Sequence, residues 1–322
     1  MPGRADADIK SDHDEQIGNQ AGIDRLVENL NCVKSEHKGW TVRQLLDTGT
    51  DYLRLAGFDE PKSEARFLLS HLLDIDTTDF YRSPEKPVDN DKLNMAFAGL
   101  IRRMHHEPAA YITGYTGFYG REFLVGPGTL IPRPDTEILI EHAVDVSKKM
   151  TGMICILDTC TGSGCIGITI ALELIKSGRE VRLDLVDIDE QAISCAQKNV
   201  LAFKLEKIAA CHLADLWPQH GKWDIITANP PYIESSVLPE LQPEVSEYEP
   251  ALALDGGRDG LLFYHRLAAE AVTYIRARGV LVLEHGYDQA DSVRELLQKN
   301  GWHGIIQLKD YGGHSRVTAG RI

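Results

Sequence analysis

The alternation of apolar and amphipathic segments from residue 153 to residue 322 constrains the fold of this chain more than any other feature. Short apolar runs of strand length are separated by longer segments with the periodicity of helices. This alternation is typical of a largely parallel sheet with helices on both faces, so we predict the α/β class. The predicted strands span 153–158, 181–187, 208–212, 223–228, 279–284, 303–308 and 315–321, and the predicted helices span 164–177, 189–203, 259–277 and 288–300.

Two smaller parts precede this region. Residues 1–38 are polar and rich in Asp, and we predict a disordered acidic tail there with one weak helix around 23–30. Residues 39–107 have helical periodicity and form the predicted helical-bundle domain. Because such a bundle in front of an enzyme domain commonly serves recognition, we expect it to recognise the substrate. Its helices are predicted to begin after a capping box at Thr41–Gln44 and to span 61–73 and 90–106.

Glycines then punctuate the stretch over 108–130. Pro108 is predicted to end the preceding helix, and short β-like runs at 115–119 and 122–125 indicate a β-hairpin that links the two domains. Pro134 suits the first turn of another helix. The second domain is therefore predicted to span 131–322.

The overall charge bears on the class of partner. The 322 residues include 34 Lys and Arg against 48 Asp and Glu, which gives a net charge of −14. A duplex-DNA binder is expected to carry a basic face. We therefore expect no direct nucleic-acid partner, and the charged surface with no obvious dimer patch predicts a monomer.

The cysteines and the hydropathy address redox state and location. None of the six cysteines forms a C-x-x-C pair and several lie in apolar runs, so we predict reduced core thiols and no metal site. No segment has the roughly 18 consecutive apolar residues of a membrane span. The N-terminal residues lack the apolar region of a secretory signal. We therefore expect a cytoplasmic protein with no membrane partner.

A glycine-containing turn follows the first predicted strand of the α/β region and opens a helix. It runs from Asp158 through Thr159, Cys160, Thr161, Gly162 and Ser163 to Gly164. Gly162 and Gly164 permit a tight turn and a close approach of a ligand to the backbone. The turn is neither the dinucleotide fingerprint, whose third glycine would fall at Ile166, nor a P-loop. The alternative is a turn that only closes a tight strand–helix connection.

Acidic residues at the next two strand ends extend this site. Asp187 ends the second strand, 23 residues after Gly164, where a carboxylate can accept hydrogen bonds from both hydroxyls of a ribose. Its alternative role is a helix N-cap, which Asp189 can provide instead. Asp215 is predicted to meet an adenine amino group, with Leu216 and Trp217 as walls of the ring. The alternative for Asp215 is a loop acid with an apolar neighbour.

The fourth predicted strand is followed directly by the sequence Asn229-Pro230-Pro231-Tyr232. Two consecutive prolines cannot continue a strand, so the backbone leaves the sheet in a rigid turn. An amide oxygen, the carbonyl at the Asn-Pro link and an aromatic ring suit a flat, neutral NH2 group. The alternative is a plain Pro-rich turn. A nucleoside site without a diphosphate site beside such a turn predicts S-adenosyl-L-methionine as cofactor.

Several ordered motifs resemble one family. They are Ile131-Pro132-Arg133-Pro134-Asp135-Thr136-Glu137, Thr161–Gly164, Asn229–Tyr232, Glu249-Pro250 with Gly256-Gly257 and Asp259-Gly260, and Asp310-Tyr311 with Arg316-Val317 and Gly320-Arg321. Over about 41–322 the chain is similar to the HemK/PrmC family of peptide chain release factor N5-glutamine methyltransferases. The resemblance implies a helical N-terminal domain, a β-hairpin linker and a seven-stranded class I, Rossmann-like methyltransferase domain.

The resemblance also implies an activity and its residues. The implied reaction methylates the glutamine amide in the Gly-Gly-Gln loop of class 1 release factors, with S-adenosyl-L-methionine as donor. Thr161, Gly162, Ser163 and Gly164 would contact the cofactor, Asp187 its ribose, Asn229 both cofactor and substrate, and Pro230, Pro231 and Tyr232 would shape the glutamine pocket. No base is identified at the turn. Asn229 and the carbonyl of Pro230 are expected to bind both amide hydrogens and to aim the nitrogen at the methyl group.

Two positions depart from the family pattern. Cys160 replaces a glycine, so its φ is expected to suit a residue with a Cβ, and related ribosomal-protein glutamine methyltransferases resemble this variant. Leu216 stands where some members place an aromatic residue, for which Trp217 is expected to compensate. Ribosomal proteins therefore remain an alternative substrate. A DNA adenine-N6 methyltransferase is a further alternative, because adenine also presents a flat NH2 group.

Overall fold

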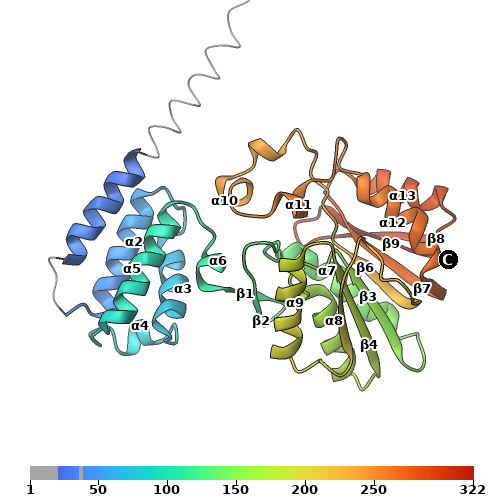
Figure 1. The fold of residues 1–322 in the computed structure, drawn as a ribbon, viewed down its shortest axis with the longest axis horizontal. Coiled ribbons are helices and arrows are strands. Elements are labelled where there is room, and N and C mark those ends of the chain that lie inside the picture. Colours follow the sequence, from blue (N-terminus) through green and yellow to red (C-terminus); the bar gives the residue numbers. More distant parts are fainter. Residues whose placement is uncertain (1–20, 36–38) are drawn as a thin grey trace, which may run out of the picture. The chain divides into compact units, whose positions relative to one another are not determined.

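The computed structural model of this protein describes residues 21–35 and 39–322 (Figure 1). The chain divides into two compact units, one ending at Thr113 and the other running from Gly114 to Ile322. The hairpin and the α/β region belong to one unit.

The first unit is helical, as predicted. Its labelled helices are α2 (Val42–Leu55), α3 (Pro61–Leu73), α4 (Asp79–Arg82), α5 (Asn90–Met104) and α6 (Ala109–Thr113). The capping box of α2 is present, since the Thr41 side chain accepts the Gln44 N–H and the Gln44 Oε1 atom accepts the Thr41 N–H. Buried side chains of these helices, among them Leu68, Phe97 and Leu100, form one apolar core.

Residues 21–35 are helical, so the helix predicted around 23–30 forms and is longer than predicted, and the prediction of disorder is wrong for this part of the tail. Ile23 is 3% exposed and Leu30 is fully buried, and both pack into the core of the helical unit. Burial of a few apolar side chains stabilises a helix whose local sequence is weak, because helices in proteins depend mainly on tertiary packing. Residues 1–20 and 36–38, the rest of the predicted tail, lie outside the described residues.

The second unit is built on a seven-stranded sheet with the order β5-β4-β3-β6-β7-β9-β8. Among the described strands of this sheet, only β9 runs antiparallel to its neighbours. The strands are β3 (Ile154–Thr159), β4 (Val181–Asp187), β5 (Ala209–Leu213), β6 (Trp223–Ala228), β7 (Ile275–Glu284), β8 (His303–Lys309) and β9 (Ser315–Arg321). The order reverses between β3 and β6, and ligands bind at such a point in open α/β sheets.

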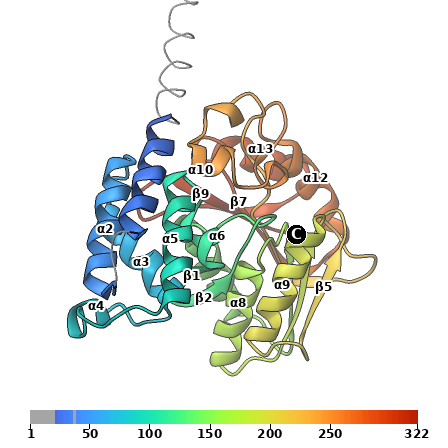
Figure 2. The ribbon, with the colours of Figure 1, turned by 60° about the vertical axis from the view of Figure 1, so that its left-hand side comes forward.

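Helices cover both faces of this sheet (Figures 1 and 2). Buried residues of α7 (Glu137–Ser147), α8 (Cys165–Lys176) and α9 (Glu190–Ala202) share one core with Ile154 and Ile156. Those of α12 (Leu262–Glu270) and α13 (Ala290–Lys299) share another with Cys155 and Leu157. Successive residues of β3 thus face opposite cores, as the pleat of a strand requires. The predicted α/β class with a seven-stranded sheet is confirmed.

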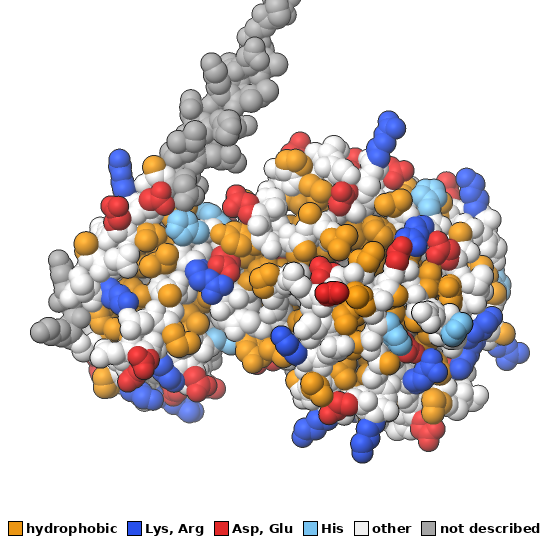
Figure 3. Space-filling model, viewed as in Figure 1, with side chains coloured by type: hydrophobic (Ala, Val, Ile, Leu, Met, Phe, Trp, Pro, Cys, Tyr) orange, Lys and Arg blue, Asp and Glu red, His pale blue; other side chains and the backbone are white. Residues whose placement is uncertain are grey.

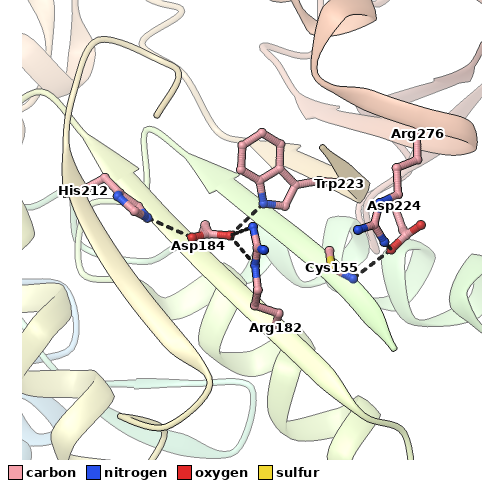
Figure 4. Close-up of polar contacts among 7 residues, drawn as sticks. All are labelled: Cys155, Arg182, Asp184, His212, Trp223, Asp224 and Arg276. Atoms are coloured by element: carbon pink, nitrogen blue, oxygen red, sulfur yellow. Dashed lines mark hydrogen bonds and ion pairs between the residues drawn. The ribbon is translucent and has the colours of Figure 1, made fainter. Parts of the chain in front are cut away.

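A polar network ties three strands together within the sheet (Figure 4). The Asp184 carboxylate on β4 lies 2.8 Å from His212 Nε2 on β5 and accepts the Trp223 indole N–H from β6, also over 2.8 Å. Arg182 donates to the same carboxylate. A second pair of bonds joins Cys155 N–H and Arg276 to Asp224. These contacts hold the strands in register around β3.

The predicted hairpin forms strands β1 (Tyr115–Phe118) and β2 (Arg121–Leu124). It packs on α9, where the Leu124 N–H donates to Asn199 Oδ1 over 2.8 Å and the Phe123 ring lies 4.8 Å from that of Phe203. Residues 108–113 were predicted to belong to the linker. Ala109–Thr113 instead form the short helix α6. Pro108 does not end the preceding helix. It precedes the first residue of α6, and its carbonyl accepts the N–H groups of Tyr111 and Ile112.

The predicted helix over 259–277 is too long. Helix α12 ends at Glu270, a 3-10 turn (Ala271–Thr273) follows, and β7 already begins at Ile275. Ile275 pairs with Trp223, after which the register shifts so that Val280 opposes Ile225. Because of this irregularity, the early start of β7 could not be predicted from the periodicity of the sequence. Between β6 and α12 the chain also forms short helices that the sequence prediction lacks, namely η2 (Leu238–Glu240), α10 (Pro243–Ser246) and α11 (Ala251–Leu254).

Candidate active site

A cavity lies at the carboxyl ends of the central parallel strands, beside the point where the strand order reverses. Its wall includes most residues that the sequence singled out. They are Cys160, Thr161, Gly162, Ser163, Asp187, Asp215, Leu216, Asn229 and Pro231. Gly164, Trp217, Pro230 and Tyr232 lie outside the wall. The structure thus brings the predicted cofactor turn and the Asn-Pro-Pro turn to one site.

The buried carboxylate of Asp158 organises the turn after β3. It accepts the Thr161 hydroxyl over 2.5 Å, the Thr227 hydroxyl of β6 over 2.7 Å and the Gly167 N–H over 3.1 Å. Burial raises the pKa of Asp158 to about 6, against the lowering effect of these three hydrogen bonds. The group links β3, β6 and the start of α8, so it fixes the position of the cavity wall.

The backbone of this turn adopts the left-handed conformation at three positions. Cys160 has φ 55°, Gly162 has φ 55° and Gly164 has φ 82°. The expectation that Cys160 has a backbone suited to a Cβ is wrong: its φ lies in the region that favours glycine, at a cost of roughly 1–2 kcal/mol. The sharp turn from β3 into α8 imposes this conformation, whichever residue occupies the position.

The two glycines of the turn have different roles. No described atom lies within 4 Å of a Cβ built at Gly162, so its face is open to the cavity. A Cβ at Gly164 would meet Ile168, Leu185 and Ala196 at 3.0–3.4 Å. Gly164 therefore serves the packing of α8 against the sheet rather than contact with a ligand.

Asp187 lies at the end of β4 with its carboxylate held by the backbone. Oδ2 accepts the Gly162 N–H over 2.8 Å and Oδ1 accepts the Asp189 N–H over 3.1 Å. Burial raises the pKa of Asp187, while backbone hydrogen bonds lower it. Asp189, not Asp187, caps α9, because its side chain accepts the Gln191 N–H. The remaining lone pairs of Asp187 can accept ribose hydroxyls.

The residues predicted around the adenine separate into two groups. Asp215 lines the cavity, but both its oxygens accept hydrogen bonds from Arg266 at 2.9 and 3.1 Å. Leu216 also lines it, with φ 63°. The expectation that Trp217 compensates for Leu216 is wrong. Trp217 turns into the core, where it stacks on Tyr274 at 4.7 Å and donates its indole N–H to Glu270.

Further cavity residues were not identified from the sequence. Apolar cavity residues of this kind are Ile188, Leu252 and Phe263. Ile188 is 54% exposed, and its place directly after Asp187 is the signal that could have found it. Leu252 lies in α11 and Phe263 in α12, and nothing in the sequence of these helices relates them to the cofactor turn.

The Asn-Pro-Pro-Tyr turn is held from several sides. Gln289 donates to the Tyr232 carbonyl over 2.9 Å, and a Cβ at Gly256 would lie 2.7 Å from the Tyr232 Cα. Burial raises the pKa of the Tyr232 hydroxyl to about 12, so the ring stays neutral. Within the described chain, Oδ1 of Asn229 is buried and has no hydrogen-bond partner. A buried acceptor without a donor is costly, so this atom suits a ligand N–H.

The other motifs of the resemblance surround this turn. Glu249 accepts the Ile131 N–H over 3.2 Å and forms an ion pair with Arg133, which joins the segment before α7 to the segment after β6. Arg316 of β9 contacts Asp135 at 3.1 Å and Asp310 at 3.0 Å. These ion pairs hold together motifs that are far apart in the sequence, so the motifs lie around one site.

A buried carboxyl group that the sequence prediction did not include lies beside Asn229. Glu284 ends β7 and is 3% exposed. Burial raises its pKa to about 7, while the Thr136 hydroxyl, Arg316 and the Asn229 amide lower it. Perturbed groups of this kind cluster at functional sites.

S-adenosyl-L-methionine fits this donor set. The open face at Gly162, the acceptor at Asp187 and the apolar residues around Leu216 suit a nucleoside, and no diphosphate site is needed. The unpaired Ser163 hydroxyl, buried in the cavity wall within the described chain, offers a further polar contact. All six cysteines are free thiols in the described residues, and burial raises the pKa of Cys160 and of Cys165.

Comparisons with known proteins agree with this arrangement. Residues 44–114 match the PrmC N-terminal domain and residues 134–241 match the methyltransferase small domain. A release factor glutamine methyltransferase of Geobacter sulfurreducens is 35% identical over 287 residues, which cover 88% of this chain and 97% of that protein. One of Thermodesulfovibrio yellowstonii is 37% identical over 259 residues, 79% of this chain and 90% of that protein.

Solved structures agree on the fold alone. The hMettl16 catalytic domain, in complex with an RNA hairpin, aligns with a TM-score of 0.51 at 14% identity. The alignment covers 72% of this chain and 82% of that one.

Proposed function

Because this chain belongs to the family of release factor glutamine methyltransferases, we propose that it methylates the N5 amide nitrogen of the glutamine in the Gly-Gly-Gln motif of class 1 release factors. It is an S-adenosyl-L-methionine-dependent methyltransferase that acts on release factor glutamine. The observation that supports the substrate atom is the buried, unpartnered Oδ1 of Asn229 in the cavity wall of the described chain.

An amide nitrogen is a weak nucleophile, because its lone pair is delocalised into the carbonyl. When bound, S-adenosyl-L-methionine supplies a methyl carbon that is electrophilic because of the adjacent sulfonium. Asn229 would accept one substrate N–H at Oδ1, and the carbonyl of Pro230 would accept the other. Together they aim the nitrogen at the methyl carbon and stabilise the positive charge that develops on it.

Other residues shape and close the pocket in this proposal. Pro230 and Pro231 fix the direction of the two acceptors, because their φ angles are locked by the ring. Tyr232 follows Pro231 in this turn, and its ring would stack on the flat amide of the bound substrate. Cys160, Thr161, Gly162 and Ser163 line the methionine end of the cofactor site, and Asp187 accepts the ribose hydroxyls.

The helical unit is the proposed recognition domain, supported by its match to the PrmC N-terminal domain. We assign it the docking of the release factor, and the α/β unit the chemistry. In the ranges 21–35 and 39–322, no helix is long and apolar enough to cross a membrane. On the face in Figure 3, Lys and Arg side chains are scattered among Asp and Glu, which supports a protein substrate over DNA.

Methyl transfer to purified substrates tests the proposal. The protein is incubated with methyl-labelled S-adenosyl-L-methionine and a class 1 release factor, a ribosomal protein or unmethylated DNA. A release factor with the Gly-Gly-Gln glutamine replaced by alanine is the matched control. We expect label in the intact release factor only, on the glutamine side chain by peptide mass spectrometry. Label in the ribosomal protein or the DNA alone, or equal label in the alanine control, would contradict the proposed substrate.

A further inference from the structure

Three buried polar atoms without hydrogen-bond partners meet beside the Asn-Pro-Pro turn of the described chain. They are Oδ1 of Asn229, Oε2 of Glu284 and Oγ1 of Thr136. Thr136 is 2% exposed and Glu284 is 3% exposed. Native proteins leave few such atoms, and each one calls for an explanation. Asn229 and Thr136 line the cavity, and the proposed substrate accounts for Asn229 only.

The strand pairing places Glu284 next to Asn229. Ala228 and Leu283 are the last paired residues of β6 and β7, which run parallel. Asn229 and Glu284 each follow directly, so they occupy equivalent positions on neighbouring strands about 4.8 Å apart. Side chains at equivalent positions of a parallel pair point to the same face. The Asn229 amide accordingly faces the Glu284 carboxyl closely enough to lower its pKa.

Glu284 has no charged partner of its own at this site in the described residues. Arg316 faces it but is already engaged by Asp135 and Asp310. The Glu284 backbone carbonyl, not its carboxyl, accepts the Tyr264 hydroxyl over 2.8 Å. The titratable and charged groups that face Glu284 from the surrounding elements are Arg316, Asp135, Tyr232, Tyr264 and Cys165.

We propose that Glu284 is a positioning residue that acts on the reaction through Asn229. Its carboxylate accepts the Nδ2 hydrogens of the Asn229 amide, which turns Oδ1 toward the substrate amide. The negative charge behind Asn229 also polarises that amide and makes Oδ1 a stronger acceptor, because hydrogen bonds in a chain reinforce one another. Oδ1 then stabilises the positive charge on the substrate nitrogen better when Glu284 is ionised. This inference rests on the proposed function for its substrate.

The arrangement predicts a pH dependence. Burial raises the pKa of Glu284 to about 7, so the carboxyl changes charge near neutral pH. Below that pH the protonated carboxyl is a weaker acceptor for Asn229, and kcat should fall. Above it, kcat should reach a plateau. Glu284→Gln keeps the shape of the side chain and removes the charge, so this variant should lose the pH dependence between about pH 6 and 8.

The kinetic test measures kcat for methyl transfer to the release factor from about pH 6 to 9. At pH 8 we expect Glu284→Gln to lower kcat about 10- to 100-fold with unchanged cofactor Kd. In the Asn229→Ala background, the same change should have no further effect, because the two residues act as one unit. A Gln variant with the wild-type kcat and pH profile, or full additivity in the double variant, would overturn the inference.

A titration without substrate separates this inference from the proposed function. The Glu284 pKa is measured by NMR with carboxyl-labelled glutamate in the wild type and in Asn229→Ala. Loss of the amide donor should raise that pKa, and an unchanged value would overturn the pairing. Asp310→Asn removes a negative charge that contacts Arg316, so this variant is the control for indirect electrostatic effects on the Glu284 pKa. A wild type that methylates no release factor would overturn the proposed function, while the titration still decides whether Glu284 and Asn229 are coupled.

Discussion

The carboxylate of Asp187 accepts the backbone N–H of Gly162 over 2.8 Å, although 25 residues separate the two in sequence. The contact joins the end of β4 to the turn that follows β3. A carboxylate held in this way is oriented before any ligand arrives, so little ordering cost remains for binding. Asp187 therefore stabilises the cofactor turn and presents its free lone pairs to the cavity at the same time.

Replacement of Asp187 by alanine should weaken cofactor binding. Hydrogen bonds to a charged group contribute about 1.5–3 kcal/mol each, so Kd for S-adenosyl-L-methionine should rise at least tenfold. Isothermal titration calorimetry measures this directly. Asp189→Ala is the comparison, because it removes the cap of α9 and should lower stability by about 1 kcal/mol. Equal Kd values for the two variants would contradict the ribose role of Asp187.

Replacement of Asn229 by alanine should act on turnover and not on cofactor binding. Loss of one positioned acceptor typically lowers kcat by about 10²–10³. The cofactor Kd should stay within about threefold of the wild type, because Asp187 and the glycine turn remain intact. Steady-state methyl transfer and calorimetry give the two numbers. Near-normal turnover in this variant would refute the proposed mechanism.

The strands and most helices were predictable because each carries its own periodicity. β4, β6 and β9 were predicted at their observed bounds. The early start of β7 was not, because its first residues are separated from the rest by the register shift opposite Trp223 and Ile225. The helix at 21–35 was weakly predicted, since its stability comes from the burial of Ile23 and Leu30 and not from local sequence.

The site was predictable where function depends on strand ends. Asp187 ends β4 and Asn229 directly follows β6, and the carboxyl ends of parallel strands meet at one edge. The direction of Trp217 was not predictable, because it depends on the left-handed backbone at Leu216. Glu284 was missed although it ends a predicted strand. The prediction considered acids near Asn229 in sequence, and only the strand order places β7 beside β6.

Replacement of Gly167 by alanine should destabilise the α/β unit although alanine favours helices. A Cβ there would lie 2.6 Å from Leu185 Cδ2 and 2.8 Å from the Asp158 Cβ. Overpacking of this kind costs about 1–3 kcal/mol, against a helix propensity gain of about 1 kcal/mol. Urea unfolding measures the difference. Gly117→Ala, where no described atom lies within 4 Å, should change stability by less than about 0.5 kcal/mol, and a larger loss there than at Gly167 would contradict the packing account.

Replacement of Asp184 by asparagine should lower stability in a pH-dependent way. Burial raises the pKa of Asp184, but hydrogen bonds from Trp223, His212 and Arg182 outweigh it, so the net pKa is below the ordinary value. Because the folded-state pKa is lowered, the stabilisation is present above the ordinary pKa of about 4 and is lost as the pH falls through the folded-state value.

We expect Asp184→Asn to cost about 1–3 kcal/mol at pH 7. That cost should shrink in unfolding experiments below about pH 4, where the wild-type carboxylate is increasingly protonated. Trp223→Phe removes only the indole donor shown in Figure 4 and should reproduce part of the loss. A cost that stays constant between pH 7 and the acid limit would show that the ionised carboxylate is not what joins β4, β5 and β6, and that packing alone accounts for the loss.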